Sequence, residues 1–397
     1  MTLKQTYSKA LVIGAGSGRD MGSAILLTEE LRKQGTKTID LAGFLTPWAL
    51  HTFNNKLENP INALNLNSKK FIPLPSAKNE INFYFEPELI QLNREFKLGI
   101  DQLYVFSLQY GTKAILRALE ELISRNNYDL IIAVDVGGDA LARKKDFPSL
   151  ITPFVDLTCI EILSRIKHKV TTKLAIIAPG VDGEINFQGI VEIFEELKKN
   201  NALEDIKIEQ ASESYQKFVK INEEIEKRTG SKSNTIRIIK SALNGETKID
   251  LTREFRIGEK EWKISFPANI VKDLVNKIFF LDINKLKMLR NNFNIWYNNI
   301  LDAVLKFRKN FGGCEVDLSY IPTSIDNYWY NDVLFILTPN CNIKEDIRKE
   351  MLEYGISIVL ENKMNALMLK KDGRLVTLPN KLLVKNYEDF YLLSGKN

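Results

Sequence analysis

The sequence predicts an α/β protein with a Rossmann-like, doubly wound and mainly parallel sheet, followed by a smaller mixed α+β region. Short apolar runs typical of strands alternate with helical segments through the first half of the chain. Three of these runs end directly in loops rich in glycine and carboxylates. Alternation at this spacing is typical of βαβ units with right-handed crossovers. With 397 residues, the chain is also longer than one ordinary domain.

The N-terminal part begins with two strands around one helix. A strand near residues 10–13 leads into a helix over roughly 21–34, which Gly35 ends, and a second strand follows at Thr36–Leu41. The next segment, residues 45–100, is punctuated by prolines and is longer than a simple connection. We interpret it as a lid or an excursion on the substrate side.

Regular alternation resumes after residue 100 and continues to about residue 200. The expected strands lie at 103–108, 130–134 and 173–178, and the expected helices at 112–125, 153–167 and 187–199.

Beyond residue 205 the pattern changes to mixed elements. We expect two charged helices around Gly230, a hairpin at 256–266, a long amphipathic helix at 283–309, and a small α+β element at 333–380 with a helix at 343–354, a strand at 356–360 and a hairpin turn at 371–373. The predicted domains are a ligand-binding domain at 1–205, a helical and mixed region at 206–344, and a small C-terminal element at 345–397.

Composition bounds the class of protein. The net charge of +5 is small for this length and the basic residues are dispersed among carboxylates, which argues against nucleic acid as a partner. No apolar run approaches the ~18 residues of a membrane span. The three cysteines, Cys159, Cys314 and Cys341, fit neither a zinc site nor a disulfide framework, so we expect a cytoplasmic protein. Two histidines exclude a histidine-rich metal centre.

The first loop follows the strand near residues 10–13 and resembles a dinucleotide fingerprint without its third glycine. Glycines let the backbone approach a ligand, and the N-terminus of the following helix favours a phosphate. Arg19 would add a bidentate contact, Asp20 would cap the helix, and Asp40 would bind a ribose at the end of the second strand. The alternative is a tight turn without a ligand. The candidate ligand-binding residues here are Gly14, Gly16, Ser17, Gly18, Arg19, Asp20 and Asp40.

The second loop places Asp135 and Asp139 on either side of Gly137 and Gly138. Two carboxylates in one tight turn repel each other unless they bind a cation or one of them holds a proton. Mg²⁺ prefers such oxygen ligands, and a carboxyl group with a raised pKa can act as a general acid or base. The structural alternative is that Asp135 accepts hydrogen bonds from loop amides and Asp139 caps the next turn.

The third loop repeats this design with Gly180, Asp182, Gly183 and Glu184. Because the loops after parallel strands emerge at one edge of the sheet, all three should line one crevice. We expect Asp139, Asp182 and Glu184 to be catalytic, and Asp135, Asp139 and Asp182 to be metal ligands. Asp156 falls at a capping-box position after Thr152 and Pro153, so we interpret that segment as structural.

Together these segments resemble an uncharacterised family, the domain of unknown function 1152, found mainly in archaea and some actinobacteria. The matching segments are 14–20, 134–142, 149–156 and 179–184, with a weaker match at 312–317. The resemblance therefore spans roughly residues 8–320. It supports the site and implies no particular reaction. A high content of Lys, Ile and Asn is typical of an AT-rich archaeal genome.

Two main hypotheses of function follow. The first is an enzyme that acts on a nucleotide, a sugar phosphate or a similar anion with help from Mg²⁺, by transfer, hydrolysis or lyase chemistry. The second is a non-catalytic nucleotide-binding or assembly subunit, which works through a protein or ribosome partner or as a homo-oligomer. An RNA-associated factor is a third option, for which steep salt dependence of binding would be the signature.

Overall fold

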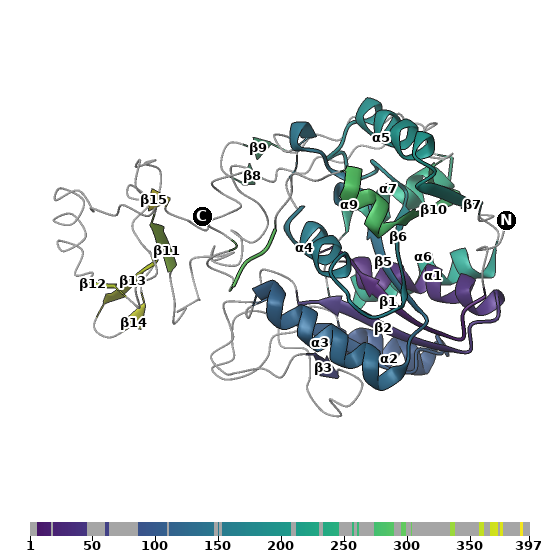
Figure 1. Ribbon diagram of the computed structural model, residues 1–397, viewed down its shortest axis with the longest axis horizontal. Coiled ribbons are helices and arrows are strands. Elements are labelled where there is room, and N and C mark those ends of the chain that lie inside the picture. Colours follow the sequence, from purple (N-terminus) through teal and green to yellow (C-terminus); the bar gives the residue numbers. More distant parts are fainter. Residues whose placement is uncertain are drawn as a thin grey trace.

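A sheet of eight strands forms the centre of the protein in the computed structural model (Figure 1). In chain order its strands are β1 (Lys9–Gly14), β2 (Thr38–Phe44), β3 (Ile61–Asn62), β4 (Leu103–Phe106), β5 (Leu130–Val136), β6 (Thr171–Ile177), β7 (Leu203–Lys207) and β10 (Lys277–Asp282). The residues that the structure describes are 6–16, 19–45, 60–62, 86–108, 111–146, 150, 153–207, 212–229, 233–245, 256–257, 260–261, 274–289, 295–298, 303 and five short strands between 334 and 391.

The order of the strands across the sheet is β3-β4-β2-β1-β5-β6-β10-β7. The five strands β4, β2, β1, β5 and β6 are parallel, while β3 and β10 run antiparallel to their neighbours. Numbered along the chain, the parallel strands stand in the order 3-2-1-4-5, which is the Rossmann arrangement. The order reverses between β1 and β5, so the region beyond their carboxyl ends is the expected place for a ligand.

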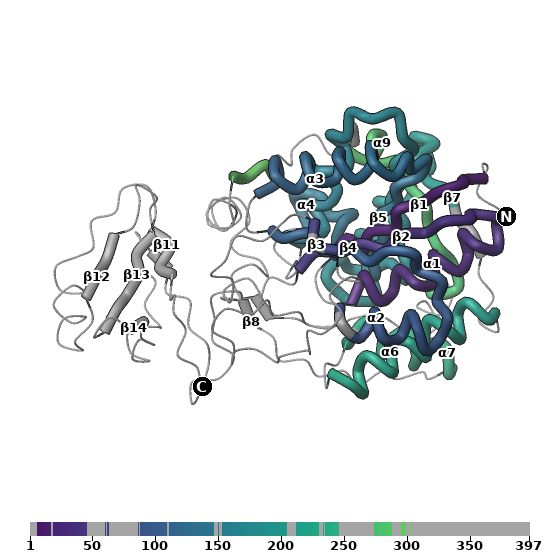
Figure 2. The backbone as a smooth tube through the Cα atoms, turned by 90° about the horizontal axis from the view of Figure 1, so that it is seen from below, coloured from purple at the N-terminus to yellow at the C-terminus, as the bar shows by residue number. Residues whose placement is uncertain are grey.

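Helices cover both faces of this sheet. Helices α3, α4 and α9 lie on one side, and α1, α2, α6 and α7 on the other (Figure 2). Every residue of α4 is buried, as expected of a mostly apolar helix packed on several sides. The helices are α1 (Asp20–Lys33), α2 (Glu86–Glu95), α3 (Gly111–Asn126), α4 (Pro153–Leu163), α5 (Phe187–Lys199), α6 (Glu213–Thr229), α7 (Asn234–Leu243) and α9 (Ile283–Leu289).

Most of the predicted elements are confirmed, with shifted ends. The second strand runs three residues beyond its expected end, to Phe44, and the helix that starts at Pro153 ends at Leu163. Helix α2 and strands β3, β7 and β10 were not predicted. Residue 205, the expected domain boundary, lies inside β7, and β10 joins the same sheet from far along the chain.

One predicted helix is wrong. A continuous helix at 283–309 is interrupted, because α9 ends at Leu289 and residues 295–298 are not helical. The backbone N–H and C=O of Tyr297 bond to Thr112 at the start of α3 instead of forming helical bonds. A tertiary contact therefore overrides the amphipathic pattern here.

The C-terminal region contains a second, antiparallel sheet in the order β12-β13-β11-β15. Its strands are β11 (Leu334–Leu337), β12 (Ser357–Leu360), β13 (Ala366–Lys371), β14 (Arg374–Leu375) and β15 (Phe390–Tyr391). Pairing of β13 with β14 confirms the hairpin expected at 371–373, and pairing of β8 (Arg256–Ile257) with β9 (Lys260–Glu261) confirms the earlier one. The helix expected at 343–354 lies outside the described residues. Among those described, no helix has both the length and the apolar character needed to cross a membrane.

Gly14 allows α1 to start unusually close to the end of β1. A Cβ at Gly14 would lie 2.3 Å from the backbone nitrogen of Met21, whereas a Cβ at Gly43 would lie 2.3 Å from the flexible end of the Met21 side chain. We expect Gly14→Ala to lower the free energy of unfolding by about 1–3 kcal/mol, because a backbone atom cannot move aside. The matched variant Gly43→Ala should destabilise less, since the methionine can change rotamer. Equal midpoints of urea unfolding for the two variants would contradict this interpretation.

Candidate functional site

The three glycine-rich loops meet where the strand order reverses. They follow β1, β5 and β6, which lie side by side in the sheet. Six acidic side chains of the described residues at this edge are buried, with exposed fractions between 1% and 8%: Asp20, Asp135, Asp139, Asp156, Asp182 and Glu184. Side chains that prefer to be charged are almost never buried this completely without a compensating partner.

The first loop brings its backbone against two carboxylates. The N–H of Gly16 donates to Asp20 Oδ2 over 2.9 Å. A Cβ at Gly16 would lie 2.6 Å from Asp156 Oδ2 and 2.7 Å from Asp20 Oδ2, so only glycine leaves room for both groups. Asp20 is the first residue of α1 and does not act as the expected N-cap, which is Arg19. Ser17 and Gly18 lie outside the described residues.

Asp135 organises the second loop from within. Its two carboxylate oxygens accept from the N–H groups of Gly138 and Ala140, each at 3.0 Å. Gly137 and Gly138 have φ of +123° and +102°, which side chains other than hydrogen rarely allow. Asp135 therefore makes the hydrogen bonds to loop amides that were the structural alternative for this residue, and the same carboxylate also faces the other acids.

The third loop is joined to the second. Gly180 donates its N–H to the carbonyl of Gly137, and the N–H of Glu184 donates to Asp182 Oδ1 over 3.0 Å. Asp182 Oδ2 lies only 1.9 Å from the position that a Cβ on Gly137 would take. The contact between the two loops therefore requires a residue without a Cβ at position 137, because the carboxylate of Asp182 packs against the backbone of the second loop there.

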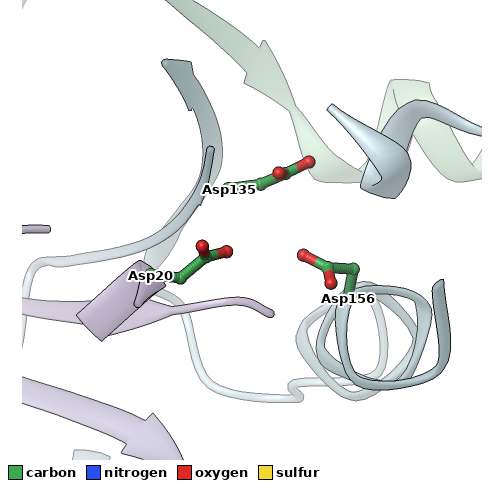
Figure 3. Close-up of side chains that lie close together, drawn as sticks. All are labelled: Asp20, Asp135 and Asp156. Carbon is green, nitrogen blue, oxygen red and sulfur yellow. The ribbon is translucent and has the colours of Figure 1, made fainter. Parts of the chain in front are cut away.

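Three of the carboxylates converge closely enough to share one cation. One ligand oxygen each of Asp20, Asp135 and Asp156 lies within 4.8 Å of the others, and the three side chains point toward one another (Figure 3). They come from the start of α1, the end of β5 and the first turn of α4. Of the residues expected to be metal ligands, only Asp135 belongs to this set. We did not predict Asp156 as a ligand, although its place near the start of a helix at the same edge was a usable signal.

Burial and mutual repulsion make these acids hard to ionise. Burial, followed by the nearby charge of Asp135, raises the pKa of Asp20 well above its usual range. Burial also raises the pKa of Asp135 to about 7 despite its two N–H donors. The pKa of Asp139 is raised by burial and then by Asp156, and that of Asp182 by burial and then by Glu184. Among the described residues, no Lys or Arg forms an ion pair with Asp20, Asp135 or Asp182.

Comparison with known proteins shows the family to which this chain belongs. Residues 11–253 match the family described as "Protein of unknown function (DUF1152)", and this match covers more than half of the chain. The chain belongs to the DUF1152 family. No curated protein matches it. The resemblance inferred from the loops is therefore confirmed, and all six buried acids lie inside the matched region of this DUF1152 protein.

Two of the expected ligand-binding residues of this DUF1152 protein make other contacts. The guanidinium of Arg19 is buried and donates from Nη1 to the carbonyl of Asn222 in α6, over 3.2 Å. Asp40 lies in the middle of β2 rather than at its end, and its carboxylate accepts from the hydroxyl of Tyr128. Its register partner Leu11 is near the start of β1, so Asp40 is far along the strands from the loops.

Proposed function

We propose that this DUF1152 protein is an enzyme that binds a phosphorylated, nucleotide-like small molecule through a divalent cation such as Mg²⁺. The observation that carries the proposal is the convergence of Asp20, Asp135 and Asp156 at the edge where the strand order reverses. Hard cations prefer carboxylate oxygens, and Mg²⁺ is usually held by one or two carboxylates together with substrate phosphates. A phosphate alone would be repelled by these acids, so a cation has to lie between the two.

The second group of acids supports a catalytic role beside that cation. Asp139 lies close to the triad formed by Asp20, Asp135 and Asp156. Two of these carboxylates, Asp156 and Asp135, raise its pKa in addition to burial. A carboxyl group with a raised pKa can donate a proton to a leaving group. We propose Asp139 as this acid, with Asp182 and Glu184 as further acid–base groups or ligands. Transfer, hydrolysis and lyase reactions all fit this arrangement.

A thermal-shift screen tests the proposal. Mn²⁺ or Mg²⁺ would be added alone and together with nucleoside phosphates, sugar phosphates and nucleotide sugars. A ligand at 100 times its Kd should add about 2.7 kcal/mol to the free energy of unfolding. We expect the shift to be lost in Gly16→Ala, which places a methyl group between Asp20 and Asp156 without removing a charge.

The control is Gly189→Ala in α5, where the added Cβ would be nearest to side-chain atoms, at 3.0 Å or more. It should keep the full shift. A shift that persists in Gly16→Ala would place the cation elsewhere, and no shift with either metal would remove the proposed site. Any ligand found would then be incubated with the protein and followed by phosphorus NMR. New resonances would show turnover, whereas an intact ligand would favour the non-catalytic binding subunit.

A further inference from the structure

A short segment outside the matched family region contacts the start of α3 and the start of α4, the helix that carries Asp156. Residues 295–298 lie more than 40 positions beyond residue 253, where the family match ends. Tyr297 is only 1% exposed, and Ile295 beside it is 4% exposed. A segment of irregular backbone this deeply buried needs specific partners, because its polar groups cannot reach water.

The backbone of Tyr297 binds the start of α3. Its carbonyl accepts from the N–H of Thr112 over 3.1 Å and from the Thr112 hydroxyl over 3.0 Å. Its own N–H donates to that same hydroxyl oxygen over 3.2 Å. The neighbouring Gly111 has φ of +77°, and a Cβ there would lie 2.4 Å from the backbone of Asn298. The contact therefore depends on the main chain of Tyr297, on both the main chain and the hydroxyl of Thr112, and on the absence of a side chain at Gly111.

The side chain of Tyr297 binds the start of α4 instead. Its ring centroid lies 5.4 Å from that of Phe154, the second residue of α4 and two residues before Asp156. The neighbouring residue Trp296 makes a cation–π contact with Arg165, whose guanidinium carbon lies 4.4 Å from the centroid of the indole ring. Farther along α4, Lys287 donates to Glu161 over 3.1 Å. Residues beyond the matched region thus hold α4 at both ends.

We propose that Tyr297 is a positioning residue that fixes the first turn of α4 and, through it, the carboxylate of Asp156. This inference rests on the proposed metal site. The ligand oxygens of Asp20, Asp135 and Asp156 lie within 4.8 Å of one another, and the place of Asp156 in this group depends on the first turn of α4. Removing the groups that orient a metal ligand typically weakens metal binding about 10–100-fold.

The test compares two substitutions of buried aromatic residues in full-length protein. Tyr297→Leu keeps an apolar side chain and the backbone bonds to Thr112 but loses the ring contact with Phe154. The control Phe279→Leu removes a similar contact, between Phe279 in β10 and Phe194 in α5, whose ring centroids are 4.6 Å apart. Tyr297→Phe serves as the rescue variant because it keeps the ring. The readouts are the Kd for Mn²⁺ and the hydrogen exchange of a peptide covering residues 154–159.

We expect Tyr297→Leu to weaken Mn²⁺ binding at least about 10-fold and to speed exchange at 154–159, while Phe279→Leu lowers Tm without either change. Tyr297→Phe should keep the wild-type Kd for Mn²⁺ and the wild-type exchange rate at 154–159. Unchanged exchange in Tyr297→Leu, or equal loss of affinity in the control, would overturn the positioning role. If wild-type protein binds no Mn²⁺, the proposed metal site fails, and the exchange data still report separately whether Tyr297 fixes α4.

Discussion

Asp20→Asn is expected to make the metal-free protein more stable at pH 8 while abolishing its stabilisation by Mn²⁺. Asp20 is buried beside Asp135, and burial together with that charge raises its pKa well above the usual range. Such a group must either hold a proton at pH 8 or be charged in an unfavourable place, and both disfavour folding. Asparagine is neutral and keeps an oxygen that can accept from the N–H of Gly16.

The expected result is a higher urea midpoint for Asp20→Asn than for the wild type at pH 8 without metal. The measurement is urea unfolding at pH 8 with and without Mn²⁺. Asp129→Asn is the control, because its carboxylate accepts from the N–H groups of Ser8 and Lys9, away from the three loops. That variant should destabilise the protein under both conditions and keep the response to Mn²⁺. If Asp20→Asn lowers stability as Asp129→Asn does, the carboxylate of Asp20 has a purely structural role.

The metal-free protein is also expected to become more stable as the pH falls from 8 to 6. The pKa values of Asp20, Asp135, Asp139 and Asp182 are all raised on folding. Between the unfolded pKa near 4 and the raised folded values, the folded state binds more protons than the unfolded state. The free energy of unfolding therefore decreases as the pH rises through this range. Because the folded pKa of Asp135 is about 7, its contribution to this trend falls mainly between pH 8 and pH 6 and is on the order of 1 kcal/mol.

A bound cation should remove this dependence. Metal binding requires the deprotonated carboxylates, so stabilisation by Mn²⁺ grows with pH and opposes the trend of the metal-free protein. Thermal melts from pH 6 to pH 8 with and without saturating Mn²⁺ would measure both curves. Asp20→Asn should flatten the metal-free curve. A metal-free protein whose stability rises with pH over this range would contradict the raised pKa values of the cluster.

The three loops could be predicted because their signals are local. Glycine and carboxylates directly after apolar runs predict turns at the carboxyl ends of strands, and parallel strands bring such turns to one edge. Asp135, Asp139, Asp182 and Glu184 are found there as expected. Asp156 was missed because its neighbours Thr152 and Pro153 explain it equally well as the start of a helix.

Contacts between distant segments could not be predicted in the same way. Arg19 has the right place in the sequence for a phosphate contact, but α6 offers it a carbonyl more than 200 residues away. Asp40 fits the spacing of a ribose-binding acid, yet β2 extends beyond it and Tyr128 occupies its carboxylate. Neither of these two contacts can be recognised from the residue types that surround Arg19 or Asp40 in the sequence.

The Rossmann-like class, the three glycine loops and the family could all be inferred from the amino-acid sequence, because apolar periodicity and glycine turns act over a few residues. Three features became visible in the folded chain alone: which acids lie close together, the place of β10 beside β6, and the binding of residues 295–298 to α3 and α4 instead of a continued helix. These features depend on which buried polar groups find partners across the fold. A hydrogen bond between Thr112 and Tyr297 joins residues that only the folded chain brings together.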